Sequence, residues 1–436
     1  MEAVRLPNGE YAESEEECLK LLLETHYPGF REEEEEIRHR NRRATKTSWE
    51  MARKIFTPER VRWAVANLAP YKAPGVDGVY PVLLQEGIEL LIGPLTNMFR
   101  SSLALGHVPE AWRIARAVFI PKAGRPSHVG VKDYRPISLT SFVLKTMETC
   151  IDWFIKDEVL RRNPLHSNQY AYREGVSAET ALHAFVSRIE AQLERGNYAV
   201  AVFMDVEGAF SHTSPHIICE EAASRGVPRP IVDWMLDLLG ARRITSTLGS
   251  YRCTGTVSMG TPQGGVTSPV DWNLVADRLL RLLNGGRCYA QAYADDFAAV
   301  TSSSDLGAAV NLMQCMLRKV TTWCTETGLN VNPDKTELVV FTRKHKVPTF
   351  TPPSLAGKKL EAKDSAKYLG VILDRKLNWN EHLEEKIRKF HAAFWLCRGT
   401  FGGGWGLKPK MMVWLYKTVI VPSVAYASVG STPCAA

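Results

Sequence analysis

The chain has 436 residues, of which 45% are hydrophobic and 23% are charged. This length predicts two to four subdomains rather than one core, and the composition excludes a disordered chain. The formal net charge of +7 is compatible with a nucleic-acid partner, because Lys and Arg release counterions when they neutralise phosphates. Nine cysteines without zinc-site spacing are typical of a reduced, intracellular protein. No apolar run of about 18 residues predicts a membrane span, and no secretory signal is visible.

The first 66 residues look like a lead-in to the rest of the chain. Clustered leucines at 19 and 21–23 predict a short helix that ends near Pro28-Gly29. An acidic run at 32–36, followed by a basic run at 38–43, predicts one solvated helix. A nuclear-import or nucleic-acid arm is the alternative. Apolar spacing then predicts helices near 82–105, 137–162, 177–194, 214–224, 228–240, 304–327, 383–394 and 408–420.

Two apolar segments with acidic ends lie in the middle of the chain. AVAVFMDV at 199–206 is rich in Val and carries Asp205 near its end, which predicts a strand buried on both faces. CYAQAYADDFAAVT at 288–301 predicts a β-hairpin whose tip carries Asp295 and Asp296. Short strands are also expected at 337–342 and 367–373, and a helix is expected to begin at Gln263-Gly264.

The acidic ends of these segments predict a site for divalent cations. Carboxylates that converge near a sheet edge repel one another unless cations join them. Oxygen ligands that leave open positions for substrate phosphates suit Mg²⁺. Two such ions about 4 Å apart stabilise both oxygens of an in-line phosphoryl transfer. Any single Asp here could instead be a turn or cap residue, so the carboxylates alone indicate only a phosphoryl-transfer site.

Seven ordered motifs, carboxylates included, resemble the polymerase of non-LTR (LINE-type) retrotransposons, and the lead-in and tail resemble its arthropod members. YADD at 293–296 looks like the catalytic signature of reverse transcriptases. MDVEGAF at 204–210 resembles the first catalytic motif of that family. The resemblance covers roughly residues 60 to 430. The other matching segments are KAPGVDGV (72–79), IPK (120–122) with DYRPISL (133–139), MGTPQGGVTSP (259–269), GLNVNPDKTEL (328–338) and KYLGVIL (367–373).

The resemblance implies a role for individual residues. Asp205, Val206, Asp295 and Asp296 would hold the metal ions, and the three aspartates and Lys335 would be catalytic. Phe210 would place its ring under the sugar and exclude a 2′-hydroxyl, so that deoxynucleotides are preferred. Further contacts are implied from Gln263 and Gly264 to the incoming nucleotide or template, from Lys122 and Arg135 to the triphosphate, from Lys335 to the departing pyrophosphate, and from the primer grip of Tyr368, Leu369 and Gly370 to the primer end.

The implied fold is α+β, a right-hand polymerase with an antiparallel palm sheet backed by helices. It would comprise an N-terminal extension at 1–66, fingers at 67–198, a palm at 199–373 and a shortened thumb at 374–436, with a reverse transcriptase domain of about 100–373. The implied reaction adds a dNTP to a primer 3′-hydroxyl with two Mg²⁺ ions, for which Mn²⁺ could substitute. An RNA template and a DNA primer are the implied partners, in a ribonucleoprotein of the nucleus or cytoplasm, and the oligomeric state stays open.

Three other functions are weighed against this one. Phe210 argues against an RNA-dependent RNA polymerase, whose members place an acid at that position. The intact carboxylates argue against a decayed element product that only binds RNA, although no endonuclease module is recognised before residue 60. An intron-type or domesticated reverse transcriptase is less favoured by KAPGVDGV and KYLGVIL. One departure from the family pattern is Asp271, where an apolar residue is more usual, and it puts the local packing in question.

Overall fold

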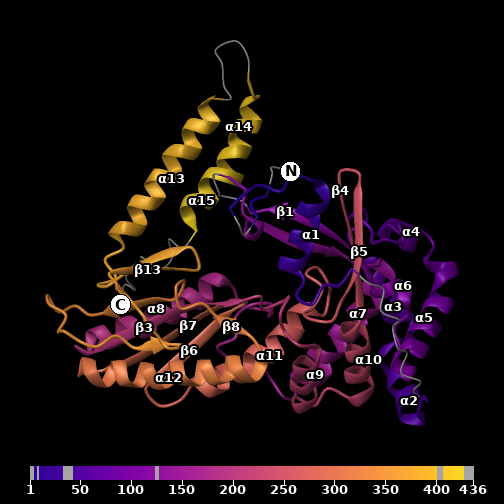
Figure 1. Cartoon of the computed structure of the whole chain (residues 1–436), viewed down its shortest axis with the longest axis horizontal. Helices are drawn as coiled ribbons and strands as arrows, with labels where there is room; N and C mark the ends of the chain where they lie inside the picture. Colours follow the sequence, from indigo (N-terminus) through magenta and orange to yellow (C-terminus); the bar gives the residue numbers. More distant parts are fainter. Residues whose placement is uncertain (1–3, 7–8, 33–42, 123–126, 400–405, 427–436) are drawn as a thin grey trace. The chain divides into compact units, whose positions relative to one another are not determined.

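The computed structural model describes residues 4–6, 9–32, 43–122, 127–399 and 406–426. Helices combine with antiparallel and mixed sheets, which confirms the α+β class (Figure 1). Most of the charged runs at 32–43, and the glycines at 402–404, fall outside the described residues. The chain passes repeatedly between two compact units, described separately below. Unit 1 is Met1–Leu165, Glu207–Arg278 and Thr325–Asn330, and unit 2 is His166–Val206, Leu279–Cys324 and Val331–Ala436.

A four-stranded sheet with the order β2-β1-β4-β5 forms the centre of unit 1. Strand β1 pairs antiparallel with β2 and parallel with β4. The predicted leucine-rich helix is α1 (Glu15–His26), which begins where the Ser14 side chain accepts a hydrogen bond from the Glu17 N–H. Its buried Leu19 and Leu22 belong to the same core as the sheet, so the lead-in helix is part of unit 1. The strands are β1 (Ile114–Pro121), β2 (Tyr134–Leu139), β4 (Arg242–Leu248) and β5 (Tyr251–Val257).

Helices make up the rest of unit 1, and the helix predicted over 137–162 begins later than expected. Residues up to Leu139 belong to β2, and α7 begins at Phe142, after Ser141 accepts a hydrogen bond from the Val143 N–H. The segment predicted near 82–105 forms α4 and α5. The remaining elements are α2 (Lys46–Ile55), α3 (Pro58–Ala66), α4 (Pro81–Glu86), α5 (Ile88–Leu105), α6 (Glu110–Arg113), η1 (Val131–Asp133), α7 (Phe142–Phe154), η2 (Ile155–Leu160), α9 (Pro215–Ser224), α10 (Arg229–Gly240) and α11 (Ser268–Leu283), the last of which ends in unit 2.

Unit 2 is built on a second sheet with the main order β12-β9-β3-β7-β6. The predicted buried strand is β3, and both β7 and β9 pair antiparallel with it. Its residues are buried on both faces, as the continuous apolar run predicts. The predicted hairpin is β6–β7. The strands are β3 (Tyr198–Glu207), β6 (Cys288–Tyr293), β7 (Asp296–Ser303), β8 (Asn330–Val331), β9 (Glu337–Phe341), β10 (Ser354–Leu355), β11 (Lys358–Lys359), β12 (Ala362–Lys363), β13 (Ser365–Tyr368) and β14 (Val371–Asp374).

Helices cover the two faces of this sheet. Phe185 and Ile189 of α8 (Ala178–Glu194) pack on one face against Phe203, together with the small β13–β14 hairpin. Helix α12 (Leu306–Thr327) runs along the opposite face (Figure 1). The segment 367–373, expected as one strand, instead forms parts of the two strands β13 and β14, which are joined by a tight turn.

Both faces of β3 are buried, and this burial holds in place the strand that carries Asp205.

The C-terminal part of unit 2 is a pair of helical segments. Helix α13 (Asn380–Gly399) contains the helix predicted near 383–394. Leu383 and Ile387 belong to an apolar stripe on this helix, and their side chains are 50% and 56% exposed. The stripe is thus not the core of a bundle among the described residues. The returning segments are α14 (Pro409–Leu415), η3 (Tyr416–Ile420) and α15 (Val421–Ala425), of which η3 and α15 contact α13.

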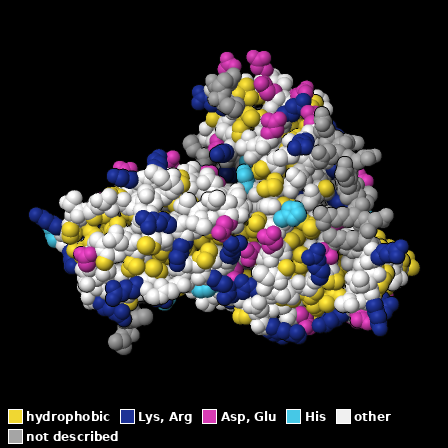
Figure 2. Space-filling model, turned by 60° about the horizontal axis from the view of Figure 1, so that its bottom comes forward, with side chains coloured by type: hydrophobic (Ala, Val, Ile, Leu, Met, Phe, Trp, Pro, Cys, Tyr) yellow, Lys and Arg dark blue, Asp and Glu magenta, His cyan; other side chains and the backbone are white. Residues whose placement is uncertain are grey.

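Charged side chains do not gather into one stripe on the face shown in Figure 2, where Lys and Arg are dispersed among acidic and apolar groups. The positive net charge is therefore not evidence for a nucleic-acid surface by itself, and local sites have to carry that argument. No helix of the described ranges has both the length and the apolarity to cross a bilayer.

Candidate active site

The β3 strand and the β6–β7 hairpin bring the predicted carboxylates together in unit 2. Asp205 lies directly opposite Asp296 in the β3–β7 register. Asp295 lies in the two-residue turn between β6 and β7, beside Ala294, whose φ of +55° is rare for a residue with a side chain. The Val206 N–H donates to the Asp295 carbonyl at 3.2 Å, which ties the hairpin tip to β3. The prediction of an acidic hairpin tip beside a strand bearing Asp205 is confirmed.

Burial and neighbouring carboxylates both disfavour negative charge at this tip. Partial enclosure by protein, followed by the neighbouring Asp295 and Asp205 carboxylates, raises the pKa of Asp296 to about 6. Lys335 is the cation of the group, with its Nζ 3.7 Å from Asp205 Oδ2. Both side chains are about half exposed, so solvent screens this pair and its attraction is weak. The site therefore favours additional positive charge.

The donor set fits divalent cations. Asp205, Asp295 and Asp296 offer hard carboxylate oxygens, which Mg²⁺ prefers, and a cation would offset both the burial and the like charges that raise the pKa of Asp296. Among the described residues, no three His, Cys, Asp or Glu side chains are already close enough to enclose an ion. Binding would therefore draw these side chains inward.

Tyr172 is a neighbour of the carboxylates that the sequence did not single out. Burial, followed by the Asp295 and Tyr293 side chains, raises the pKa of its phenol. Its φ is +59°. The preceding segment pairs along β6, since the Tyr170 N–H donates to the Ala292 carbonyl at 3.0 Å. This pairing is too short to leave an alternating apolar pattern in the sequence. Tyr170 and Tyr172 themselves were the signal that could have drawn attention to this segment.

Phe210 lies in unit 1, where it contacts the segment at 259–269. Its ring centroid is 6.2 Å from that of Trp272, and its carbonyl accepts a hydrogen bond from the Thr261 N–H at 2.7 Å. A Cβ on Gly260 would approach the Phe210 carbonyl oxygen to 2.5 Å, and Gly260 has a φ of +73°. Glycine is therefore required where this segment presses on the Phe210 turn.

Gln263 and Gly264 do not begin a helix, contrary to the prediction. They lie in a loop, and α11 begins only at Ser268. The Gln263 carbonyl accepts a hydrogen bond from the Ser138 N–H at 2.8 Å, and Gly264 has a φ of +116°. This left-handed geometry stops a helix from including Gly264. Free helical N–H groups are consequently not available at these two residues.

The two predicted cations of unit 1 lie on one hairpin. Arg135 of β2 is opposite Ile120 of β1, and Lys122 follows β1 directly. Arg135 is exposed. Ser138, which holds the Gln263 loop, is three residues along β2 from Arg135, or about 10 Å. Lys122 is bonded opposite Asp133, so it lies about 17 Å along the strand direction from Ser138, with Arg135 between them.

The three predicted primer-grip residues differ in accessibility. Tyr368 is only 3% exposed and packs its ring 5.3 Å from that of Phe203. Its hydroxyl accepts a hydrogen bond from Gln291 Nε2 at 3.0 Å, so its side chain belongs to the core of unit 2. Leu369 and Gly370 form the turn, with φ values of +45° and +80°. Only these two residues reach the tip of the β13–β14 hairpin.

Comparison with known proteins adds independent findings. Residues 120–373 match the family described as "Reverse transcriptase (RNA-dependent DNA polymerase)". The chain is 29% identical over 397 residues to the probable RNA-directed DNA polymerase from transposon BS of Drosophila melanogaster, covering 88% of this chain and 44% of that protein. It is 27% identical over 389 residues to the RNA-directed DNA polymerase from mobile element jockey of the same species, covering 85% and 41%.

The probable RNA-directed DNA polymerase from transposon X-element, also of Drosophila melanogaster, is 25% identical over 378 residues, covering 85% of this chain and 41% of that protein. The chain thus spans less than half the length of these curated relatives. The family match covers more than half of the chain and includes all three carboxylates. With the carboxylates adjacent on paired strands and the match extending through both sheets, the chain belongs to the reverse transcriptase family.

Proposed function

We propose that this chain is the RNA-directed DNA polymerase of a non-LTR retrotransposon. The observation that carries the proposal is the pairing of Asp205 with Asp296 beside the Asp295 turn. Adjacent carboxylates of this kind favour bound cations, because Asp295 and Asp205 add to the burial that disfavours charge on Asp296. The family match and the names of the relatives support the same activity.

In this proposal the carboxylates form a two-metal site for phosphoryl transfer. Asp205, Asp295, Asp296 and the main chain of Val206 would hold two Mg²⁺ ions, with Mn²⁺ as a substitute. When bound, such ions promote attack by the primer 3′-hydroxyl and stabilise the leaving pyrophosphate. The Nζ atom of Lys335 lies 3.7 Å from Asp205 Oδ2. It would supply a positive charge beside the carboxylates and a proton to the leaving pyrophosphate.

The residues of unit 1 would bind the nucleotide. Lys122 and Arg135, on one hairpin, would clamp the negatively charged triphosphate. Gln263, on the adjoining loop, would contact the base or template, and the Gly264 backbone would approach the nucleotide closely. Phe210 would exclude a 2′-hydroxyl. The hydrogen bond from the Thr261 N–H to the Phe210 carbonyl holds the backbone of this residue in place.

We also propose that the units combine into the right-hand arrangement. Fingers at 67–198, a palm at 199–373 and a thumb at 374–436 would enclose an RNA template and a DNA primer. Leu369 and Gly370 would hold the primer end. The exposed apolar stripe of α13 would then face the template–primer duplex.

The test is primer extension on an RNA template by this chain. We expect Mg²⁺-dependent cDNA synthesis, abolished by Asp295→Asn with little loss of RNA binding. The matched control is Asp364→Asn, an exposed Asp of unit 2 away from the carboxylates. Activity retained by the Asp295 variant in Mg²⁺ would remove the metal role. Comparable use of rNTPs and dNTPs would favour an RNA polymerase instead.

A further inference from the structure

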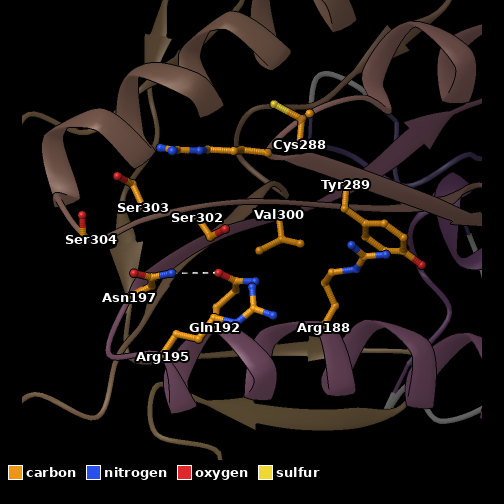
Figure 3. Close-up of a pocket in the computed structure, with 12 residues that line it drawn as sticks. Arg188, Gln192, Arg195, Asn197, Cys288, Tyr289, Val300, Ser302, Ser303 and Ser304 are labelled. Atoms are coloured by element: carbon orange, nitrogen blue, oxygen red, sulfur yellow. Dashed lines mark hydrogen bonds between the residues drawn. The ribbon is translucent and has the colours of Figure 1, made fainter.

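A polar cavity of about 420 Å³ lies entirely within unit 2. It opens between the C-terminal half of α8 and the end of the β6–β7 hairpin that is remote from the turn (Figure 3). In Figure 3, Gln192 rises from α8 toward Ser302 of β7, whereas Arg188 rises toward the Tyr289 ring. The lining residues are three arginines (Arg188, Arg195, Arg287), five hydroxyl or amide residues (Gln192, Asn197, Ser302, Ser303, Ser304) and Gly286, Cys288, Tyr289 and Val300.

The cavity is far from the catalytic carboxylates. Tyr198 pairs with Ser303 at this end of the sheet, whereas Asp205 pairs with Asp296 at the other end. Seven residues of extended strand separate the two positions, or about 23 Å at roughly 3.3 Å per residue. A nucleotide held by Asp205 and its neighbours therefore cannot also fill this cavity.

Positive charge dominates the cavity. No carboxylate lines it, and within the described residues no acidic side chain forms an ion pair with Arg188, Arg195 or Arg287. The nearest acids in sequence are Glu190, Glu194 and Asp305, and the cations that act on Glu190 are Arg343 and His183 rather than the arginines of the cavity. Asp305 is already used, because its Oδ2 accepts the Ala308 N–H at 2.7 Å in the first turn of α12. Three guanidinium groups thus share a small space with no partner of opposite charge.

The neighbouring groups are arranged as donors rather than as a base-binding surface. Arg188 lies over the Tyr289 ring, 4.4 Å from its centroid, so that face of the ring is not available for stacking. Gln192 Oε1 accepts from Asn197 Nδ2 at 3.0 Å, which leaves the Gln192 amide N–H groups to donate. Guanidinium and amide donors with serine hydroxyls are the groups that bind phosphate oxygens.

We propose that this cavity binds a phosphate of the RNA backbone, as a contact outside the active site. The identification of the ligand as RNA rests on the proposed function. The inference that the cavity binds an anion rests only on the residues of the cavity. The contact is independent of base sequence, because the cavity offers no free aromatic face and no apolar slot for a base. It would anchor a stretch of template that is not being copied.

Binding of a labelled single-stranded RNA, followed by fluorescence anisotropy, tests the proposal. The pocket variant is Arg195→Gln/Arg287→Gln. The control is Arg161→Gln/Arg318→Gln, which removes the same charge from exposed positions outside the cavity. We expect the pocket variant to bind about fivefold more weakly, with the slope of log K against log salt reduced by about 0.7, the contribution of one phosphate on a single strand. The control variant should show less than half of the affinity loss and of the slope change seen for the pocket variant. Both effects should be the same for RNAs of different sequence.

Equal losses in the pocket and control variants would overturn the proposal, as would a loss confined to one RNA sequence. Ser304→Glu is a second variant that places a carboxylate at the exposed rim and keeps every arginine; it should weaken RNA binding similarly. Titration of inorganic phosphate, followed by ³¹P line broadening, separates the two sources of the anion. Phosphate binding lost in the pocket variant, with RNA affinity unchanged, would assign the cavity to a small phosphate ligand and refute the RNA contact.

Primer extension separates this proposal from the catalytic one. Saturating template and primer should be extended by the pocket variant at the wild-type rate, because the cavity is remote from the carboxylates. Asp295→Asn should lose extension and still show the pocket-dependent part of RNA binding. An inactive wild-type chain with pocket-dependent RNA binding would sink the proposed activity and leave the phosphate site standing.

Discussion

The buried carboxyl of Asp271 is the most informative group to perturb in unit 1. Asp271 is 1% exposed in the first turn of α11, and its Oδ1 has no hydrogen-bond partner. Burial first, and then the nearby Glu148 carboxyl, raises its pKa well above the usual range. Burial also raises the pKa of Glu148, but hydrogen bonds from the Val266 N–H and the Thr267 hydroxyl to its carboxylate oppose that rise. Burial therefore favours the protonated form of Asp271 in the folded protein.

Asp271→Asn keeps the volume of the side chain and removes its titration. Folding binds a proton at Asp271 that the unfolded chain releases above its ordinary pKa of about 3.8. The free energy of unfolding is therefore highest below that value and falls as the pH rises toward the raised pKa. Each pH unit of this window costs at most about 1.4 kcal/mol. The Asn variant lacks this term, so it should match the wild type in acid and exceed it at neutral pH.

Urea unfolding at a series of pH values, without divalent ions, measures the difference. Asp364→Asn, at an exposed position, is the control and should follow the wild-type curve. Parallel pH dependence in the wild type and the Asp271 variant would refute the protonated buried carboxyl. A variant less stable than the wild type at neutral pH would show that the hydrogen bond between Asp271 and Thr267 stabilises the fold by more than burial and the repulsion between Asp271 and Glu148 destabilise it.

Three further outcomes are expected. Mg²⁺ affinity, measured by calorimetry, should weaken as the pH falls below about 6, because the ion must then displace the Asp296 proton; an affinity that stays constant from about pH 5 to about pH 8 would exclude Asp296 as a ligand. Phe210→Ala should raise incorporation of rNTP relative to dNTP by about tenfold or more in primer extension, and unchanged discrimination would leave the ring a packing group beside Trp272. Tyr368→Phe should lower the free energy of unfolding by about 1 kcal/mol, because Gln291 loses an acceptor; weaker primer binding at full stability would instead place the hydroxyl on the primer.

The sequence predicted the carboxylate site well because its strands are locally distinctive. Short continuous apolar runs rich in Val and Ala flank Asp205 and the Asp295-Asp296 pair, and such runs are typical of strands covered on both faces, as the β3–β7 pair is. Tyr368 was harder. Alternation along β13 directs Ala366 and Tyr368 inward and Lys367 outward, so the residue named as a primer contact is a core residue.

The sheet of unit 1 was not predicted at all. Its strands β4 and β5 mix Thr and Arg with few large apolar residues, and β1 pairs in parallel with β4 across more than a hundred residues. No local pattern reports such a long-range pairing. The late start of α11 was missed for a different reason, since the left-handed φ of Gly264 is set by its contact with Ser138 rather than by its neighbours in sequence.

The interleaving of the two units constrains how this protein can be divided or recombined. Each unit is assembled from three separate stretches of chain, so no single cut releases either one intact. One crossing falls between Val206 and Glu207, directly after the strand residue Asp205 and just before the Phe210 turn. Neither unit can be inherited, exchanged or expressed by itself as one continuous segment. Recombination among related elements should therefore keep both units together, with crossover points outside the region that encodes them.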